Sequence, residues 1–170
     1  MTPTVLAEAA VYYLARFSTS AANLRRVLKR KVTLSARHYG DDSAALFAEI
    51  ESLIAAYVQK GVLNDALYAE SRHASLRRRG GSSRAIAGRL AAKGIDPDTI
   101  AATLAGSATK HADYEAALVL ARRRRLGPFR TGDRADHRQK DLAILGRAGF
   151  DYETAARVID AQDTAAPADR

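Results

Sequence analysis

The segment KGVLNDALYA, Lys60 to Ala69, contains a complete transition from one helix to the next. Gly61 can adopt the left-handed conformation that ends a helix, and the apolar residue after it can pack back on the last turn. Asn64 can then accept hydrogen bonds from the free amides at the start of a second helix. This order of residues predicts a tight joint between two helices.

The same joint is predicted at two other places. A glycine, an apolar residue and an aspartate follow one another at Lys93–Asp96 and again at Ala148–Asp151. One such joint is ordinary in a helical protein. Three joints of the same composition suggest that the chain is built from duplicated units.

An alignment of the chain with itself supports duplication. Two segments each contain a serine cap, apolar residues spaced by four and a basic end. A shift of 62 residues pairs them as follows: Ser20 with Ser82, Leu24 with Ile86, Leu28 with Leu90, and Lys31 with Lys93. The third copy is looser, because the loop GPFRTGDRAD precedes its matching residues.

Together these patterns predict an all-α protein of three tandem three-helix repeats, stacked into an elongated, curved array. No segment shows the alternation that is typical of a strand. We expect the repeats at residues 4–61, 62–106 and 112–161. The first repeat would carry an insertion at about 33–42, and residues 162–170 would form a disordered tail.

Basic residues gather once in each expected repeat. The formal net charge is +8, and residues 11–40, 72–95 and 122–140 hold most of the 27 Lys and Arg residues. A single basic run is usually a solvated helix face. Recurrence in three repeats favours a surface for a polyanion. The candidate binding residues are Arg25, Arg26, Lys29, Arg30, Arg77, Arg78, Arg79, Arg84, Arg89, Lys93, Arg122, Arg123, Arg124 and Arg125.

Arg77, Arg78 and Arg79 form a run of three consecutive arginines. It precedes Gly80-Gly81, so we expect all three side chains at an exposed helix end. Their replacement by alanine would then leave the fold nearly intact and weaken binding to DNA.

Several classes of function are disfavoured by the sequence. The chain has no cysteine, which excludes disulfides, thiol catalysis and thiolate metal sites. It lacks the common phosphate-binding, zinc-protease and serine-hydrolase motifs, and its four histidines lack metal-ligand spacing. We therefore expect no catalytic residues, no metal and no cofactor. Without a signal peptide or a membrane-length apolar run, we expect a soluble, cytoplasmic monomer.

The run Lys60 to Ala69 resembles a signature of the RecX family, which regulates the RecA recombinase. Residues Arg79-Gly80, Lys93–Ile95 and Gly149-Phe150 are also similar to that family, and the resemblance extends from about Tyr13 to Ile159. It implies three tandem three-helix repeats that bind along the groove of the RecA–DNA filament. It also implies inhibition of RecA's ATPase and strand exchange in recombination and repair, and sequence-independent binding to single- and double-stranded DNA.

Two positions depart from the family pattern. Val32 stands where a glycine usually ends the helix, and Leu67 stands where arginine is common. The first departure leaves the geometry after Val32 open.

Two alternatives to RecA regulation remain open. A helix-turn-helix transcription regulator is one, because Arg84–Leu90, a turn and Thr99-Ile100 follow that rhythm. Asp96 and Asp98 argue against it, since they would repel phosphates at the start of a recognition helix. A helical-repeat scaffold for other proteins is the second. Whether the basic face contacts RecA protein or DNA phosphates is also open.

Overall fold

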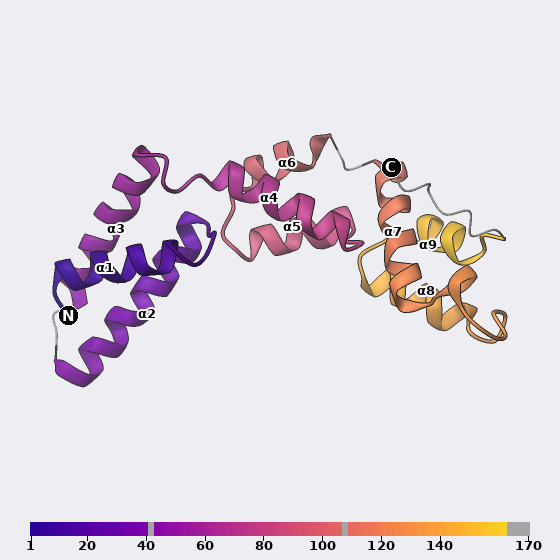
Figure 1. Cartoon of the computed structure of the whole chain (residues 1–170), viewed down its shortest axis with the longest axis horizontal. Helices are drawn as coiled ribbons and strands as arrows, with labels where there is room; N and C mark the ends of the chain where they lie inside the picture. Colours follow the sequence, from indigo (N-terminus) through magenta and orange to yellow (C-terminus); the bar gives the residue numbers. More distant parts are fainter. Residues whose placement is uncertain (41–42, 107–108, 163–170) are drawn as a thin grey trace. The chain divides into compact units, whose positions relative to one another are not determined.

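The computed structural model describes residues 1–40, 43–106 and 109–162. These residues form nine α-helices and one short 3-10 helix, without a strand (Figure 1). The all-α prediction is therefore confirmed. Residues 163–170 of the predicted tail lie outside the described part. The helices are α1 (Pro3–Leu14), α2 (Ala21–Tyr39), α3 (Ser43–Gln59), α4 (Asp65–Arg78), α5 (Ser83–Ala91), α6 (Pro97–Ala105), α7 (Lys110–Arg124), η1 (Gly127–Phe129), α8 (Arg138–Arg147) and α9 (Tyr152–Ile159).

The chain divides into two compact units. Unit 1 contains Met1–Glu70 and Leu90–Thr99, and unit 2 contains Ser71–Arg89 and the chain from Ile100 onward. The α-helices follow one another as three groups of three, which agrees with three-helix repeats. The unit boundaries divide the second group, and the exact limits of the repeats stay a prediction. None of the described helices is both long and apolar enough to cross a membrane.

Unit 1 has its core between α1, α2 and α3. The apolar residues of α2 recur every fourth position, at Leu24, Leu28 and Val32, and all three are fully buried. This spacing places them on one face of the helix, which packs on α3. Val27, one position before Leu28, is only half-buried.

The segment after Val32 continues α2. Residues 33–39 add about two helical turns, and the helix ends at Gly40, whose φ is +72°. Most of the segment predicted as an insertion is therefore helical, while residues 41–42 lie outside the described part.

Unit 2 has its core between α7, α8, α9 and η1 (Figure 1). Alanines on α7 allow the other helices to approach it closely, and Leu145, Val158 and Ile159 fill the space between them. Asp141 of α8 is 1% exposed in this core. Its Oδ1 accepts a hydrogen bond from Arg130 at 2.6 Å, and its Oδ2 accepts one from the Gly127 amide at 2.8 Å.

The Asp141 carboxyl stays charged in spite of its position. Burial raises the pKa of Asp141, but the hydrogen bonds from Arg130 and from the Gly127 amide outweigh burial. Its pKa therefore lies below the ordinary value of an aspartate. Arg130, one of the basic residues at 122–140, is part of the core structure rather than of an open surface.

All three predicted glycine joints are present. Gly61, Gly94 and Gly149 have φ values of +70°, +76° and +93°. Each joint buries one apolar residue between the glycine and the Asx residue, since Leu63, Ile95 and Phe150 are at most 5% exposed, while Val62, directly after Gly61, is exposed. The side chains of Asn64, Asp96 and Asp151 each accept a hydrogen bond from the amide three residues later, at 3.0, 2.8 and 2.7 Å. The local chemistry of glycine, apolar residue and Asx thus sets these helix boundaries.

A set of hydrogen bonds between segments that are distant in sequence occurs once in each unit. In unit 1, the Ser20 hydroxyl accepts a hydrogen bond from the Asn23 amide at 3.1 Å and donates to the Lys93 carbonyl at 2.5 Å. The Ala21 amide donates to Asp65 Oδ1 at 2.8 Å. Ser20 thus begins α2 and fastens it to the chain that follows α5.

Unit 2 contains a matching hydrogen bond for each of these three. The Ser82 hydroxyl accepts from the Ala85 amide at 3.1 Å and donates to the Ala148 carbonyl at 2.7 Å. The Ser83 amide donates to Asp113 Oδ1 at 3.0 Å. We call each set a serine joint: the first consists of Ser20, Ala21, Asp65 and Lys93, the second of Ser82, Ser83, Asp113 and Ala148. The predicted pairing of Ser20 with Ser82 is confirmed as a pair of helix caps.

Candidate partner-binding surface

The candidate basic residues of α2 differ in the ion pairs and hydrogen bonds that they form within unit 1. Arg25 Nε donates to Glu51 Oε2 at 2.8 Å, and Lys29 Nζ lies 3.1 Å from Glu51 Oε1. Hydrogen bonds from Arg25 and Lys29 lower the pKa of Glu51. Arg26 donates to the Ala92 carbonyl at 3.2 Å, and Arg30 is exposed. Glu51 therefore offsets part of the positive charge on this helix.

Lys93 is part of the first serine joint. Its carbonyl accepts the Ser20 hydroxyl, and its Nζ donates to Asn23 Oδ1 at 3.3 Å. Its side chain is half-buried. These contacts make Lys93 a structural residue of unit 1 as well as a candidate for partner contact.

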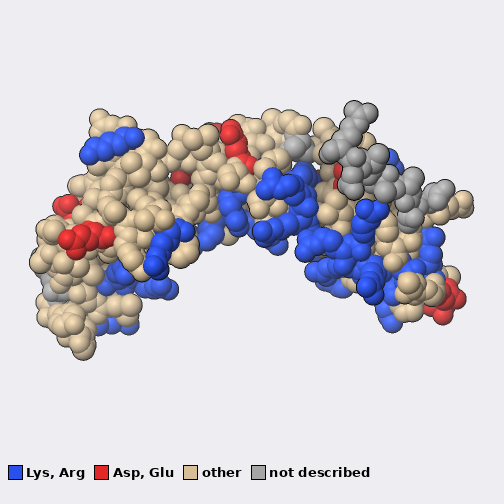
Figure 2. Space-filling view, in the orientation of Figure 1, with Lys and Arg blue, Asp and Glu red and all other residues tan. Residues whose placement is uncertain are grey.

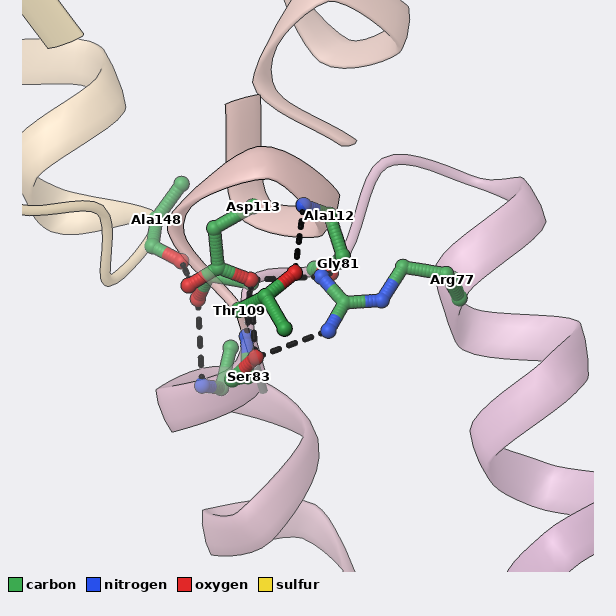
Figure 3. Close-up of polar contacts among 9 residues, drawn as sticks. Arg77, Gly81, Ser83, Thr109, Ala112, Asp113 and Ala148 are labelled. Atoms are coloured by element: carbon green, nitrogen blue, oxygen red, sulfur yellow. Dashed lines mark hydrogen bonds and ion pairs between the residues drawn. The ribbon is translucent and has the colours of Figure 1, made fainter. Parts of the chain in front are cut away.

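Arg77 differs most from the prediction, because it does not lie at an exposed helix end. Its side chain is 17% exposed, and its guanidinium points toward Ser83 and Asp113 (Figure 3). Nη1 lies 2.6 Å from Asp113 Oδ1 and 3.0 Å from the Gly81 carbonyl, and Nη2 donates to Ser83 Oγ at 2.7 Å. Arg77 thus holds the second serine joint in place. The expectation that all three side chains of the arginine triplet lie at an exposed helix end is wrong for Arg77.

The other candidate residues of unit 2 are exposed, and Figure 2 shows Lys and Arg gathered over α5, α7 and α8. Arg123 of α7 donates to the Arg79 carbonyl at 2.8 Å, and the Arg122 guanidinium lies 5.4 Å from the centre of the Phe129 ring. The remaining exposed candidates are Arg78, Arg79, Arg84, Arg89, Arg124 and Arg125.

A groove of about 520 Å³ lies among these residues in unit 2. Its polar lining consists of five arginines, with no acidic side chain: Arg79, Arg89, Arg123, Arg124 and Arg147. Its apolar lining includes Leu76, Ile86, Leu120 and Ile144. Four of the five arginines are among the sequence candidates.

The fifth arginine of the groove, Arg147, is absent from the candidates. It lies beyond the basic stretch 122–140, and the six residues between Lys140 and Arg147 include no Lys or Arg. Only its place at the end of α8, directly before the third glycine joint, could have drawn attention to it. Counting basic runs cannot find an isolated residue that the fold brings to a cluster.

No group of three or more His, Asp or Glu side chains in the described part of the chain is placed to hold a metal ion. What the surface can do is bind negative charge, because guanidinium groups form paired hydrogen bonds with carboxylates and phosphates.

The chain is similar to known proteins along most of its length. The family described as RecX, second three-helix domain, matches residues 64–104. The Regulatory protein RecX of Myxococcus xanthus is 41% identical over 162 residues, which cover 94% of this chain and 87% of that protein. The Regulatory protein RecX of Agrobacterium fabrum is 29% identical over 153 residues, which cover 89% and 80%.

A solved structure has a similar fold. The crystal structure of RecX from Lactobacillus salivarius matches with a TM-score of 0.66 at 19% sequence identity, covering 92% of this chain and 94% of that chain. At this identity the match concerns the fold alone.

Proposed function

Because the chain belongs to the RecX family of regulatory proteins, we propose that it regulates the RecA recombinase, chiefly as an inhibitor that binds the RecA–DNA filament and DNA. The observation that carries the proposal is the 41% identity with a Regulatory protein RecX over 94% of this chain. RecA inhibition itself is what the resemblance of the Lys60–Ala69 run implies.

The exposed arginines support a polyanionic partner. A RecA–DNA filament presents phosphates, and a protein that neutralises phosphates gains affinity independently of base sequence. In unit 2, eight of the candidate arginines lie on the surface, while Arg77 serves the fold. The proposal therefore assigns filament binding to the exposed set and not to Arg77.

The start of α6 speaks against a transcription regulator that reads bases with this helix. The Asp96 side chain accepts a hydrogen bond from the Thr99 amide, and its hydrogen bonds with Thr99 lower the pKa of Asp96. The carboxylate is thus charged at neutral pH and would repel a phosphate at the helix start. The exposed residues of α6 include Ala101, Ala102 and Ala105, which offer no hydrogen bonds to base edges.

The test is RecA-catalysed ATP hydrolysis on single-stranded DNA, followed as this protein is added from substoichiometric amounts to an excess over RecA. We expect hydrolysis and strand exchange to fall together. The DNA is kept in excess of both proteins, so that inhibition cannot arise from occupation of all free DNA. If saturating protein leaves both activities unchanged on preformed filaments, the proposed function is wrong.

A further inference from the structure

We propose that the arginine groove of unit 2 binds an acidic peptide segment that carries aliphatic side chains. This proposal deepens the proposed function and rests on it in one respect, because it assigns part of the same basic surface to a protein partner rather than to DNA. The groove combines five guanidinium groups with an apolar lining in about 520 Å³. Such a volume is typical of sites that bind a small ligand or a few side chains.

The guanidinium groups of the groove are complementary to the carboxylates or phosphates of a ligand. Within the described part of the chain, Arg89, Arg124 and Arg147 are exposed and form no ion pair. Because no acidic residue lines the groove, nothing in its wall offsets their charge. An anionic partner would supply the missing countercharges through charge-assisted hydrogen bonds.

The apolar lining distinguishes a peptide from a nucleic acid. Leu120 and Ile144 are half-buried and present apolar surface to the groove, while Leu76 and Ile86, at most 4% exposed, form the packed layer beneath it. Sites that bind single-stranded nucleic acid without sequence preference combine a basic groove with aromatic rings on which bases stack. The residues that line this groove include no aromatic side chain. An aliphatic lining fits a leucine or isoleucine side chain, whose burial removes apolar surface from water.

The groove is formed in advance by main-chain contacts. Gly80 has a φ of +82°, and a Cβ at this position would lie 2.8 Å from the Ala116 carbonyl oxygen and from the Leu120 amide nitrogen. Glycine therefore allows the turn that follows α4 to lie directly against α7. The hydrogen bond from Arg123 to the Arg79 carbonyl joins the same two segments. A site that is already formed loses less entropy when the peptide binds.

The test measures the binding of labelled eight-residue peptides to the full chain by fluorescence anisotropy. One peptide contains six glutamates and two leucines, and the second has serine in place of both leucines and the same charge. We expect the leucine peptide to bind at least about tenfold more tightly, because a buried leucine contributes that much to an affinity. A labelled eight-nucleotide oligothymidine is the third probe.

Two variants of one helix provide the matched comparison. Arg89→Ala and Arg84→Ala both remove an exposed arginine from α5, but only Arg89 lines the groove. We expect Arg89→Ala to lower the affinity for the leucine peptide about fivefold. Arg84→Ala should lower this affinity less than about twofold. Arg147→Ala repeats the comparison from α8, and circular dichroism verifies the fold of each variant.

Three results would overturn the proposal. The first is equal affinity for the leucine and serine peptides, and the second is an equal loss in Arg89→Ala and Arg84→Ala. The third is tighter binding of the oligothymidine than of the leucine peptide, with this binding lost in Arg89→Ala. That result would make the groove a nucleic-acid site. RecA is absent from this experiment, so its failure and the failure of the proposed function are distinguishable.

Discussion

Arg77 and Arg78 are neighbours in the sequence, yet their side chains have opposite surroundings. Arg77 bonds to Asp113, Ser83 and the Gly81 carbonyl, while Arg78 is exposed. We expect Arg77→Ala to lower the free energy of unfolding by about 2–3 kcal/mol, because it leaves Asp113 without its countercharge. Arg78→Ala should change this free energy by less than about 0.5 kcal/mol. Urea unfolding of both variants measures the difference, and equal losses would contradict the role of Arg77.

The sequence could not separate these two residues. A run of three arginines makes each of them equally basic, and the helix period alone does not say which face is covered. The partner of Arg77 is Asp113, which lies 36 residues away and becomes a neighbour only through packing. Arg147 was missed for the opposite reason, since it has no basic neighbours in the sequence but lies with four other arginines in space.

The glycine joints can be tested at the scale of the helices they connect. Gly61 and Gly149 both have positive φ, but a Cβ at Gly61 would meet open space, whereas one at Gly149 would lie 2.6 Å from Ser82 Oγ. We expect Gly61→Ala to cost about 1 kcal/mol of backbone strain. Gly149→Ala should cost about 3 kcal/mol, because it also displaces the serine of the second joint.

The readout of this comparison is twofold. Urea unfolding gives the free-energy losses, and hydrogen exchange of the Ala85 amide, which donates to Ser82 Oγ, reports on the joint itself. Faster exchange of this amide in Gly149→Ala than in Gly61→Ala is expected. Similar losses and similar exchange in both variants would show that the close contact is not important for stability.

The helix boundaries were largely predictable because their chemistry is local. Gly61, the apolar residues behind it and Asn64 lie within a few residues of one another, so a short segment contains all the information. The extension of α2 beyond Val32 does not follow from the family pattern, in which a glycine usually ends the helix at this position. The signal was present, since no glycine or proline occurs between Val32 and Gly40.

The whole chain is expected to bind DNA through phosphates. Arg78 and Arg84 are exposed and lie outside the groove. The double variant Arg78→Ala, Arg84→Ala should reduce the log–log salt slope on single-stranded DNA by ~0.7 per lost contact, or about 1.4 in total. The reduction should be the same for different base sequences.

A control of equal charge accompanies this variant. Arg37→Ala together with Arg72→Ala removes two exposed arginines that are not among the candidates. If both double variants change the slope equally, only net charge matters and no particular surface binds DNA. A loss confined to one base sequence would favour the transcription regulator instead.

Composition predicted a polyanionic partner for the whole molecule, but it could not say which cations are available. Glu51 already engages Arg25 and Lys29, and Asp141 engages Arg130. These pairs depend on contacts between segments that are distant in sequence. A charge count therefore overestimates the number of Lys and Arg side chains that are available to a partner.

The two serine joints also bear on how such a chain can change over generations. In each joint the acceptor for the serine hydroxyl is a main-chain carbonyl, which every residue type provides, and the two copies indeed use Lys93 and Ala148. The cap amides likewise belong to different residues, Asn23 and Ala85. Only the serine and the aspartate use their side chains in both copies, and the second copy adds the Arg77 side chain. Mutation can thus erase nearly all resemblance between copies of the unit while the coupling between helices is inherited intact.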